Sequence, residues 1–328
     1  MGTSSIITFS EAINAAQRQA MELDDEVFLY GLGVDRTSGI FGSTTGLKEL
    51  FGEKRVFDGP VSEQALTALA AGAAVRGMRP ILVHQRLDFM MYSLDQIVNW
   101  ISLWRFKSSG KSTMPLVIRA IVGKGWGQGP QHAKSLHTWF AHLPGLQVVM
   151  PSSPSEAKGL LLSSIFSDAP TIFIEGRSEY SMTESVPDEP YFIRLGKALI
   201  RKEGADVTIV SFGSMIPTVL RAHEDLVSKG VSADVIDLRT LAPLDMETVL
   251  ASVKKTGRLV VAEPGWQAFG AAAEIVSSVA EAGHLRSPPR RVAWPNSHIP
   301  MSSPLEQKFY PTVDDVVMAC MQTIGAPA

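Results

Sequence analysis

The chain has 328 residues, of which 45% are hydrophobic and 19% are charged, and its formal net charge is −3. This composition is typical of a soluble globular protein that is long enough to form two hydrophobic cores. The small negative charge gives no electrostatic reason to expect binding to nucleic acid or to an anionic membrane.

The number of cysteines and the first residues of the chain indicate the cellular compartment in which we expect the protein. The single cysteine, Cys320, cannot form an internal disulfide, which favours a reducing environment. No apolar run approaches the roughly 18 residues that a membrane span needs. The first basic residue is Arg18, so the chain does not open with the basic region of a signal peptide. We therefore expect a cytoplasmic protein.

The first half of the chain alternates predicted helices with short apolar runs. Thr8 and Glu11 have the spacing of a capping box and predict an amphipathic helix through about Leu23, and Ser153 with Glu156 repeats the device. Apolar runs typical of buried parallel strands lie at residues 27–30, 80–83, 115–121, 147–150 and 171–174. This alternation predicts a doubly wound α/β domain, with ligand bound at the carboxyl ends of the strands.

Residues 57–64 read FDGPVSEQ and contain the most informative carboxylate of the chain, Glu63. A short strand is predicted at 55–57, and the Ala-rich run 65–75 predicts a helix that another helix can approach closely. A carboxylate at this junction is expected to be buried. On this octapeptide alone, Glu63 could equally be a first-turn acid favoured by the helix dipole, with Ser62 as the cap.

Three side chains that can bind a ligand follow the strand predicted at 80–83. They are Gln85, Arg86 and Phe89. An amide can hydrogen-bond an exocyclic nitrogen, and an aromatic ring can stack on a flat heterocycle. From the residues alone, Phe89 could also be plain core, and Arg86 could form a salt bridge with a nearby aspartate.

A glycine-rich segment, residues 123–129, precedes the histidine candidates and is flexible enough for a mobile loop. An imidazole in such a loop can transfer a proton or orient an acceptor, although most lone loop histidines are simply solvated. His132 is singled out as the catalytic candidate only by the family resemblance given below. His137 is left open as a substrate contact, and His142 is interpreted as structural.

Between residues 177 and 196 the composition turns to Ser, Glu, Pro and Asp, and the apolar periodicity ends, which predicts an interdomain linker. Strands predicted at 207–212, 232–238 and 258–262 then alternate with helices. We therefore divide the chain into a first domain over 1–180, a linker over 181–197 and a second α/β domain over 198–328.

Four blocks in the same order resemble the β subunit of the thiamine-diphosphate-dependent E1 component of 2-oxo acid dehydrogenases, within the transketolase-like superfamily. The blocks are FGEKRVFDGPVSEQ, GLQVVMPSSPSEAKGLL, VIDLRTLAPLD and KKTGRLVVAE. The resemblance runs through nearly the whole chain. It implies two doubly wound α/β domains, namely a thiamine diphosphate pyrimidine-binding domain and a transketolase C-terminal-like domain.

The resemblance also implies a role for each candidate residue. Glu63 matches the glutamate that holds N1′ of the cofactor's aminopyrimidine, so that the cofactor's own 4′-imino nitrogen can act as a base. A carboxyl group suits this task when burial lets it exchange a proton near neutral pH. Val61, Gln85 and Phe89 would line the same ring, and His132 matches the histidine that borders the substrate channel.

The resemblance further implies a partner. Thiamine enzymes bind the diphosphate through Mg²⁺ held by a Gly-Asp-Gly segment and a downstream Asn, and this chain has no Gly-Asp-Gly run. We therefore expect no metal ligands in this chain and an α-type E1 subunit that holds Mg²⁺ and the diphosphate. Two β subunits would associate through their second domains in an α2β2 assembly, which would decarboxylate a 2-oxo acid such as pyruvate and pass the acyl group to a lipoyl acyltransferase.

The chain departs from the family pattern at several places. Leu32 stands where an acidic residue is common, Arg86 stands in place of an aromatic residue, and residues 295–300 replace a turn that contains Asp-Thr-Pro. Arg86 could bind a carboxylate of the substrate or of the partner, because a guanidinium presents a planar fork of donors. Ser167 falls on the acidic position of a potassium site in some relatives, so no monovalent ion is predicted.

These departures leave two alternative functions open. One is a related thiamine diphosphate carboligase that joins the acyl anion to a carbonyl or other acceptor. The other is a non-catalytic scaffolding subunit. The chain retains all four of the candidate cofactor and catalytic residues, which argues against this alternative: Glu63, Gln85, Phe89 and His132. The 2-oxo acid itself is not specified by the sequence.

Overall fold

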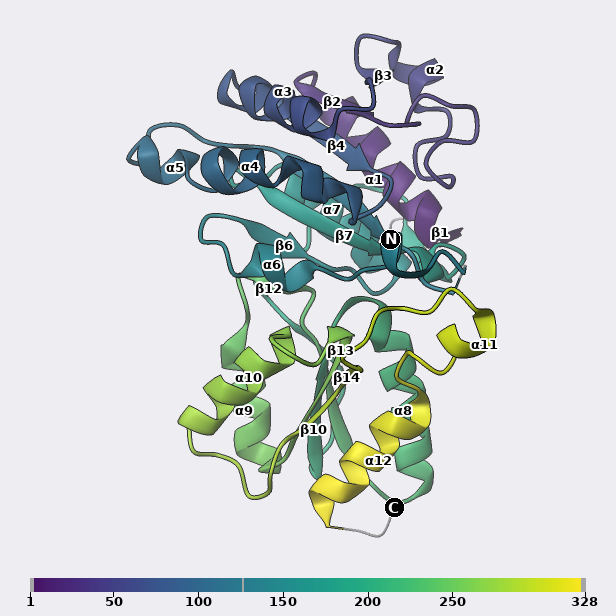
Figure 1. Ribbon diagram of the computed structural model, residues 1–328, viewed down its shortest axis with the longest axis vertical. Coiled ribbons are helices and arrows are strands. Elements are labelled where there is room, and N and C mark those ends of the chain that lie inside the picture. Colours follow the sequence, from purple (N-terminus) through teal and green to yellow (C-terminus); the bar gives the residue numbers. More distant parts are fainter. Residues whose placement is uncertain (1–2, 126, 326–328) are drawn as a thin grey trace. The chain divides into compact units, whose positions relative to one another are not determined.

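The computed structural model describes residues 3–125 and 127–325 (Figure 1). The chain forms two compact units. The first comprises Met1–Lys124 and Trp139–Leu195, and the second comprises Gly125–Thr138 and Gly196–Ala328. The segment that carries His132 and His137 therefore belongs to the second unit.

The main sheet of the first unit contains parallel strands in the order β6-β7-β5-β4-β2-β3. Every strand predicted for this half of the chain is confirmed, with ends displaced by a residue or two. The bounds are β2 (Val27–Gly31), β3 (Val56–Asp58), β4 (Arg79–His84), β5 (Val117–Val122), β6 (Gln147–Val149) and β7 (Thr171–Gly176). The central strands β2, β4 and β5 are almost entirely buried, as expected for a parallel sheet covered on both faces.

The helices of this unit begin where the capping signals predict. Thr8 Oγ1 accepts a hydrogen bond from Glu11 N at 3.2 Å and Thr8 N donates to Glu11 Oε2 at 2.7 Å, which confirms the capping box. The α-helices are α1 (Phe9–Leu23), α2 (Leu47–Phe51), α3 (Glu63–Val75), α4 (Leu94–Gln96), α5 (Trp104–Lys107), α6 (His137–Ala141, which spans the boundary between the units) and α7 (Pro154–Ile165). Short turns of 3₁₀ or π helix are η1 (Phe89–Ser93), η2 (Ile97–Ile101) and η4 (Arg177–Glu179).

Helices α1 and α7 pack against each other and cover one face of this sheet, where the core of the first unit lies (Figure 1). Fully buried members of this core come from α1, the sheet and α7, and include Phe9, Ile13, Leu29, Val83, Leu161 and Phe173. Burial of this apolar face is the main source of stability for the unit.

The segment predicted as a linker contains a strand. β8 (Thr183–Pro187) pairs in antiparallel register with β1 (Ser4–Thr8), and Lys158 Nζ donates to the carbonyl oxygens of Pro187 and Asp188. Periodicity could not predict β8, because Val186 is its only buried residue. Part of the segment is therefore held against the first unit by backbone pairing and by a lysine.

The second unit has a sheet in the order β14-β13-β10-β11-β9, in which only β9 is antiparallel to its neighbour. Its strands are β9 (Leu199–Lys202), β10 (Val207–Ser211), β11 (Ala233–Asp237), β12 (Thr240–Ala242), β13 (Leu259–Trp266) and β14 (Arg290–Trp294). Its other elements are η3 (Gly129–Gln131), η5 (Gly213–Met215), α8 (Ile216–Ser228), α9 (Met246–Thr256), α10 (Ala271–Glu281), α11 (Ser303–Glu306) and α12 (Val313–Ile324). The predicted second α/β domain is confirmed.

No helix within residues 3–125 and 127–325 is both long enough and apolar enough to cross a membrane.

Candidate cofactor site

Glu63 is the first residue of α3, five residues after the end of β3. The sequence predicts a buried carboxylate here, and that expectation is wrong for the single chain, because Glu63 is half-buried and Val61 beside it is 84% exposed. Ser62 occupies the N-cap position but makes no side-chain cap hydrogen bond. The first turn of α3 is therefore open at the surface of the first unit.

The position of this turn is nevertheless fixed by the helix that follows it. Thr67 Oγ1 lies 2.8 Å from both Glu63 O and Ser93 Oγ, which ties α3 to η1. Tyr30 Oη, on β2, donates to Leu66 O at 2.5 Å. Gly59 allows close packing of the preceding loop, since a Cβ there would lie 2.4 Å from Leu66 Cδ2.

Gln85 directly follows β4 and is held by the loop after β2. Its Nε2 donates to Leu32 O at 2.8 Å, and a Cβ on Gly33, where φ is +80°, would approach this nitrogen to 2.7 Å. Asp58, at the end of β3, accepts a hydrogen bond from Gly33 N at 2.9 Å and so fixes the loop. A glycine at 33 is thus required both by the backbone and by the close approach of Gln85.

Phe89 is half-buried and is the first residue of η1, the turn that packs against α3. Glu63, Gln85 and Phe89 therefore come from neighbouring elements at the carboxyl ends of β3 and β4, as the sequence predicts. β3, which precedes Glu63, and β4, which precedes Gln85, pair with opposite edges of β2.

His132 lies in the second unit, at the end of η3, and is half-buried. The glycine segment before it is anchored, because Gly125 N and Gly127 N donate to the two carboxylate oxygens of Glu306 at 2.8 and 3.1 Å. Trp126, between them, lies outside the described residues. No local sequence signal points to Glu306, which is about 180 residues away in the chain.

His137 is enclosed within the second unit and is only 1% exposed. Its Nδ1 lies 2.9 Å from Ser135 Oγ, its Nε2 lies 3.9 Å from Glu263 Oε2, and its ring contacts Phe212 edge-on at 5.3 Å. A Cβ on Gly265 would approach its Cε1 to 2.7 Å. Within this unit His137 is a packed internal residue, and its role as a substrate contact stays a prediction.

Arg86 and Arg177 both pack on the ring of Phe41 in the first unit. Their Cζ atoms lie 5.0 and 4.8 Å from the ring centroid, and Arg177 Cζ lies 4.9 Å from the centroid of Tyr180. Arg86 Nη1 also donates to Gln85 O at 2.7 Å. Burial lowers the pKa of both guanidinium groups, and the charge of Arg177 lowers the pKa of Arg86 further. Arg177 was missed from the sequence; it directly follows β7 but lies three residues beyond the end of the strand predicted at 171–174.

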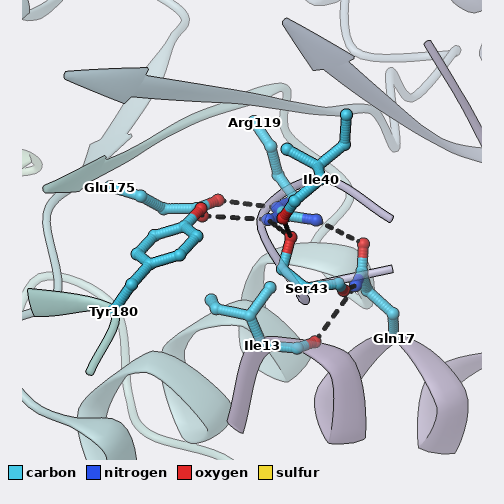
Figure 2. A network of polar contacts seen from close by, with 7 residues as sticks. All are labelled: Ile13, Gln17, Ile40, Ser43, Arg119, Glu175 and Tyr180. Carbon is cyan, nitrogen blue, oxygen red and sulfur yellow. Dashed lines mark hydrogen bonds and ion pairs between the residues drawn. The ribbon is translucent and has the colours of Figure 1, made fainter. Parts of the chain in front are cut away.

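A buried polar network beneath these residues joins four parts of the first unit (Figure 2). Arg119 donates to Glu175 from Nε at 2.6 Å and from Nη2 at 2.9 Å, to Gln17 Oε1 at 2.6 Å and to Ser43 Oγ at 2.9 Å. Tyr180 Oη donates to Glu175 Oε2 at 2.5 Å. Burial and the charge of Glu175 both raise the pKa of Tyr180. The network ties α1, the Phe41 loop, β5 and β7 together.

No group of three or more His, Cys, Asp or Glu side chains within the described parts of the chain could hold a metal ion.

Two family models match the chain. The transketolase pyrimidine-binding domain matches residues 5–183, and the transketolase C-terminal domain matches residues 196–316. The chain is similar over 100% of its length, with a TM-score of 0.80 and 21% identity, to a solved structure described as a split gene transketolase, inactive beta4 tetramer, of which it covers 100%. At this identity the likeness supports the fold alone.

Curated relatives are similar over nearly their whole length. The chain is 39% identical to the pyruvate dehydrogenase E1 component subunit beta of Staphylococcus aureus (strain Mu50), with 97% of this chain and 98% of the relative covered. It is 36% identical to the acetoin:2,6-dichlorophenolindophenol oxidoreductase subunit beta of Bacillus subtilis (strain 168), with 98% of each covered. The chain belongs to the family of thiamine-diphosphate-dependent E1 β subunits, in which a transketolase pyrimidine-binding domain is joined to a transketolase C-terminal domain.

Proposed function

We propose that this chain supplies the aminopyrimidine half of a thiamine diphosphate site and that, with an α-type E1 subunit, it decarboxylates a 2-oxo acid and transfers the acyl group to a lipoyl acceptor. The observation that carries the proposal is Glu63 at the open first turn of α3, next to the elements that present Gln85 and Phe89. Bound thiamine diphosphate would supply the nucleophilic carbon and the electron sink of the reaction.

The side chains present suit an aminopyrimidine ring. The Glu63 carboxyl group would share a proton with a ring nitrogen, and Phe89 offers a face for stacking. Because Gln85 Nε2 is engaged by Leu32 O, its Oε1 is the acceptor for an exocyclic amino group. Val61, which is 84% exposed in the single chain, would be covered by the ring and by the partner.

The diphosphate and Mg²⁺ would be held mainly by the α-type subunit. A hard cation beside phosphate groups needs several oxygen ligands, and the sequence has no Gly-Asp-Gly run to provide them. The partner's contact beside Glu63 would also exclude water from the open turn, which would strengthen the proton sharing that the carboxyl group performs. The second domains of two β subunits would join two such sites in an α2β2 assembly.

His132 would transfer a proton or orient the acyl acceptor. It is half-buried, and the segment before it is held through the two amides that donate to Glu306. An imidazole is the side chain whose unperturbed pKa allows both proton donation and acceptance near neutral pH. Because the segment that precedes His132 is anchored, the imidazole would keep the same position from one turnover to the next.

The test of the proposal is to co-express the chain with its α-type partner and to supply a 2-oxo acid, thiamine diphosphate, Mg²⁺ and a lipoylated acceptor domain. We expect release of CO₂ from the 2-oxo acid together with stoichiometric acylation of the lipoyl group, measured by mass spectrometry. Release of CO₂ with the acyl group recovered only on an added aldehyde or ketone would contradict the acceptor proposed. No release of CO₂ from any 2-oxo acid would contradict the reaction itself.

A further inference from the structure

Residues 125–138, which we call the histidine segment, belong to the second unit and carry both His132 and His137. In the chain they lie between β5 and β6, which are strands of the first unit. The segment is therefore joined to its own unit by tertiary contacts alone. The structure describes Gly125 and residues 127–138 of the segment, and contacts at three points hold them against the second unit.

The first point of contact is Glu306, which is only 3% exposed. Its carboxylate accepts hydrogen bonds from Gly125 N at 2.8 Å, from Gly127 N at 3.1 Å and from Tyr310 Oη at 3.0 Å. Gly125 and Gly127 have positive φ angles of 80° and 66°, which glycine adopts without strain. The backbone can therefore turn both amides toward one carboxylate, which fixes the start of the segment.

The second point of contact is Ala133, directly after His132. Ala133 is only 2% exposed, so its methyl group is removed from water and held by apolar packing. It belongs to a cluster of buried residues from the last part of the second unit, namely Trp294, Ile299, Phe309 and Tyr310. This packing fixes the backbone on the C-terminal side of His132.

The third point of contact is His137, which is enclosed by side chains and backbone of the second unit. Its Nδ1 lies 2.9 Å from Ser135 Oγ, and its Nε2 lies 3.9 Å from Oε2 of Glu263, on β13. Phe212 contacts the ring edge-on, and Gly265 leaves room for it, since a Cβ there would approach Cε1 to 2.7 Å. Glu263 is thus the acidic side chain that faces His137 within the described part of the unit.

The carboxylate of Glu263 decides which nitrogen of His137 carries the proton. Glu263 is fully buried and accepts a hydrogen bond from Ala272 N at 3.1 Å. A proton on Nε2 of His137 points toward this carboxylate and leaves Nδ1 to accept from the Ser135 hydroxyl, whereas a proton on Nδ1 would turn the Nε2 lone pair toward the negative charge. At 3.9 Å the attraction is electrostatic, and burial strengthens it. Polar contacts therefore run from β13 through His137 to Ser135, three residues after His132.

We propose that Glu263 and His137 are positioning residues for His132, and that neither touches the substrate. Glu263 orients the imidazole of His137, and His137 holds Ser135 and so fixes the end of the segment that carries His132. This inference rests on the proposed function, because His132 is the residue that transfers a proton or orients the acyl acceptor there. It gives His137 a role other than substrate contact, in agreement with its 1% exposure within the second unit.

Limited proteolysis of the full chain tests the anchoring without any activity measurement. The segment contains the bond after Lys134 and begins at the bond after Lys124, so trypsin can report on its two ends separately. We expect His137→Leu to raise the rate of cleavage after Lys134 by about tenfold or more, through local opening, and to leave cleavage after Lys124 unchanged. Glu263→Gln should act in the same direction, and Glu306→Gln should instead raise cleavage after Lys124. His137→Gln keeps an N–H donor and should be cleaved at nearly the wild-type rate.

Kinetics in the complex with the α-type partner test whether the anchoring acts through His132. We expect His137→Leu to lower kcat for acyl transfer to the lipoyl domain by about 10- to 100-fold, with KM for the 2-oxo acid unchanged. In a His132→Ala background the same substitution should change kcat by less than about twofold, because the residue that it positions is gone. His137→Gln should recover most of the rate. The matched control His223→Leu, at a half-buried position on α8 of the same unit, should keep the wild-type rate.

The outcomes separate this inference from the proposed function. Inactivity of every complex, wild type included, would contradict the proposed function, whereas faster cleavage after Lys134 would still support the anchoring. Unchanged cleavage in both His137→Leu and Glu263→Gln would overturn the inference. An equal loss of kcat from His137→Leu with and without the His132 side chain, or a change in KM that depends on the 2-oxo acid supplied, would also overturn it. If His137→Leu does not fold, Glu263→Gln, which keeps the size of the side chain, decides in both assays.

Discussion

Arg119 and Glu175 form a two-point ion pair that is completely enclosed by the first unit, with Nε to Oε1 at 2.6 Å and Nη2 to Oε2 at 2.9 Å. The two residues lie on the adjacent strands β5 and β7. Gln17 and Ser43 accept two further hydrogen bonds from the guanidinium group, so four of its five N–H donors are bonded to buried protein oxygens. The pair holds α1 and the Phe41 loop against the sheet.

Removing one member of this pair should destabilise the first unit strongly. We expect Arg119→Met to lower the free energy of unfolding by about 3 to 5 kcal/mol, because Glu175 would be left charged and buried without its partner. Urea denaturation followed by circular dichroism measures the change. The double variant Arg119→Met/Glu175→Met should recover part of the loss, and a double variant as unstable as the single one would contradict this explanation.

His84 should make the stability of the chain depend on pH. Burial lowers the pKa of His84 from 6.5 to about 4, and its Nε2 has no hydrogen-bond partner among the described residues. The unfolded chain therefore binds a proton between about pH 6.5 and 4 that the folded chain excludes, so the free energy of unfolding falls as pH falls through this window. Between pH 7 and pH 5 the contribution of His84 should be about 2 kcal/mol.

The check is to compare the wild type with His84→Leu at both pH values. In His84→Leu the decrease in the free energy of unfolding between pH 7 and pH 5 should be smaller than in the wild type by about 2 kcal/mol. The titrating group is then absent, while the buried side-chain volume is roughly kept. An identical pH dependence in the two proteins would show that His84 does not titrate as described.

Gly270 should not tolerate a side chain. A Cβ at this position would lie 1.8 Å from Glu263 Oε1, and Glu263 is fully buried and accepts a hydrogen bond from Ala272 N at 3.1 Å. We expect Gly270→Ala to lower the free energy of unfolding of the second unit by about 1 to 3 kcal/mol through overpacking. Gly72→Ala, inside α3 with nothing near its Cβ position, should instead raise the stability of the isolated chain by up to about 1 kcal/mol. Equal effects of the two substitutions in thermal unfolding would refute the contact argument.

The isolated chain should bind thiamine diphosphate weakly or not at all. Its proposed residues contact only the aminopyrimidine ring, and the open turn at Glu63 leaves that ring exposed to water on one side. Calorimetric titration of the chain alone and of its complex with the α-type partner measures the difference. Tight binding of the cofactor by the chain alone would contradict the division of the site between two subunits.

The sequence predicts the framework of the molecule well, because strands such as β4 and β7 are continuous apolar runs and the capping box at Thr8 is a local signal. It does not predict contacts between distant residues. The anchoring of the glycine segment by Glu306, the enclosure of His137 beside Glu263 and the meeting of Arg86 with Arg177 depend on tertiary packing alone. The burial expected of Glu63 is likewise a tertiary property, and in the single chain its side chain is only half-buried.

The most direct test of the central claim is the turnover of the Glu63→Gln variant in the complex with the α-type partner. Glutamine keeps the size of the side chain but cannot exchange a proton with the aminopyrimidine ring. We expect kcat for decarboxylation of the 2-oxo acid to fall at least roughly a hundredfold. The control Glu53→Gln, on an exposed turn of the same unit, should keep the wild-type rate. A Glu63→Gln complex that assembles normally and turns over at the wild-type rate would contradict the account.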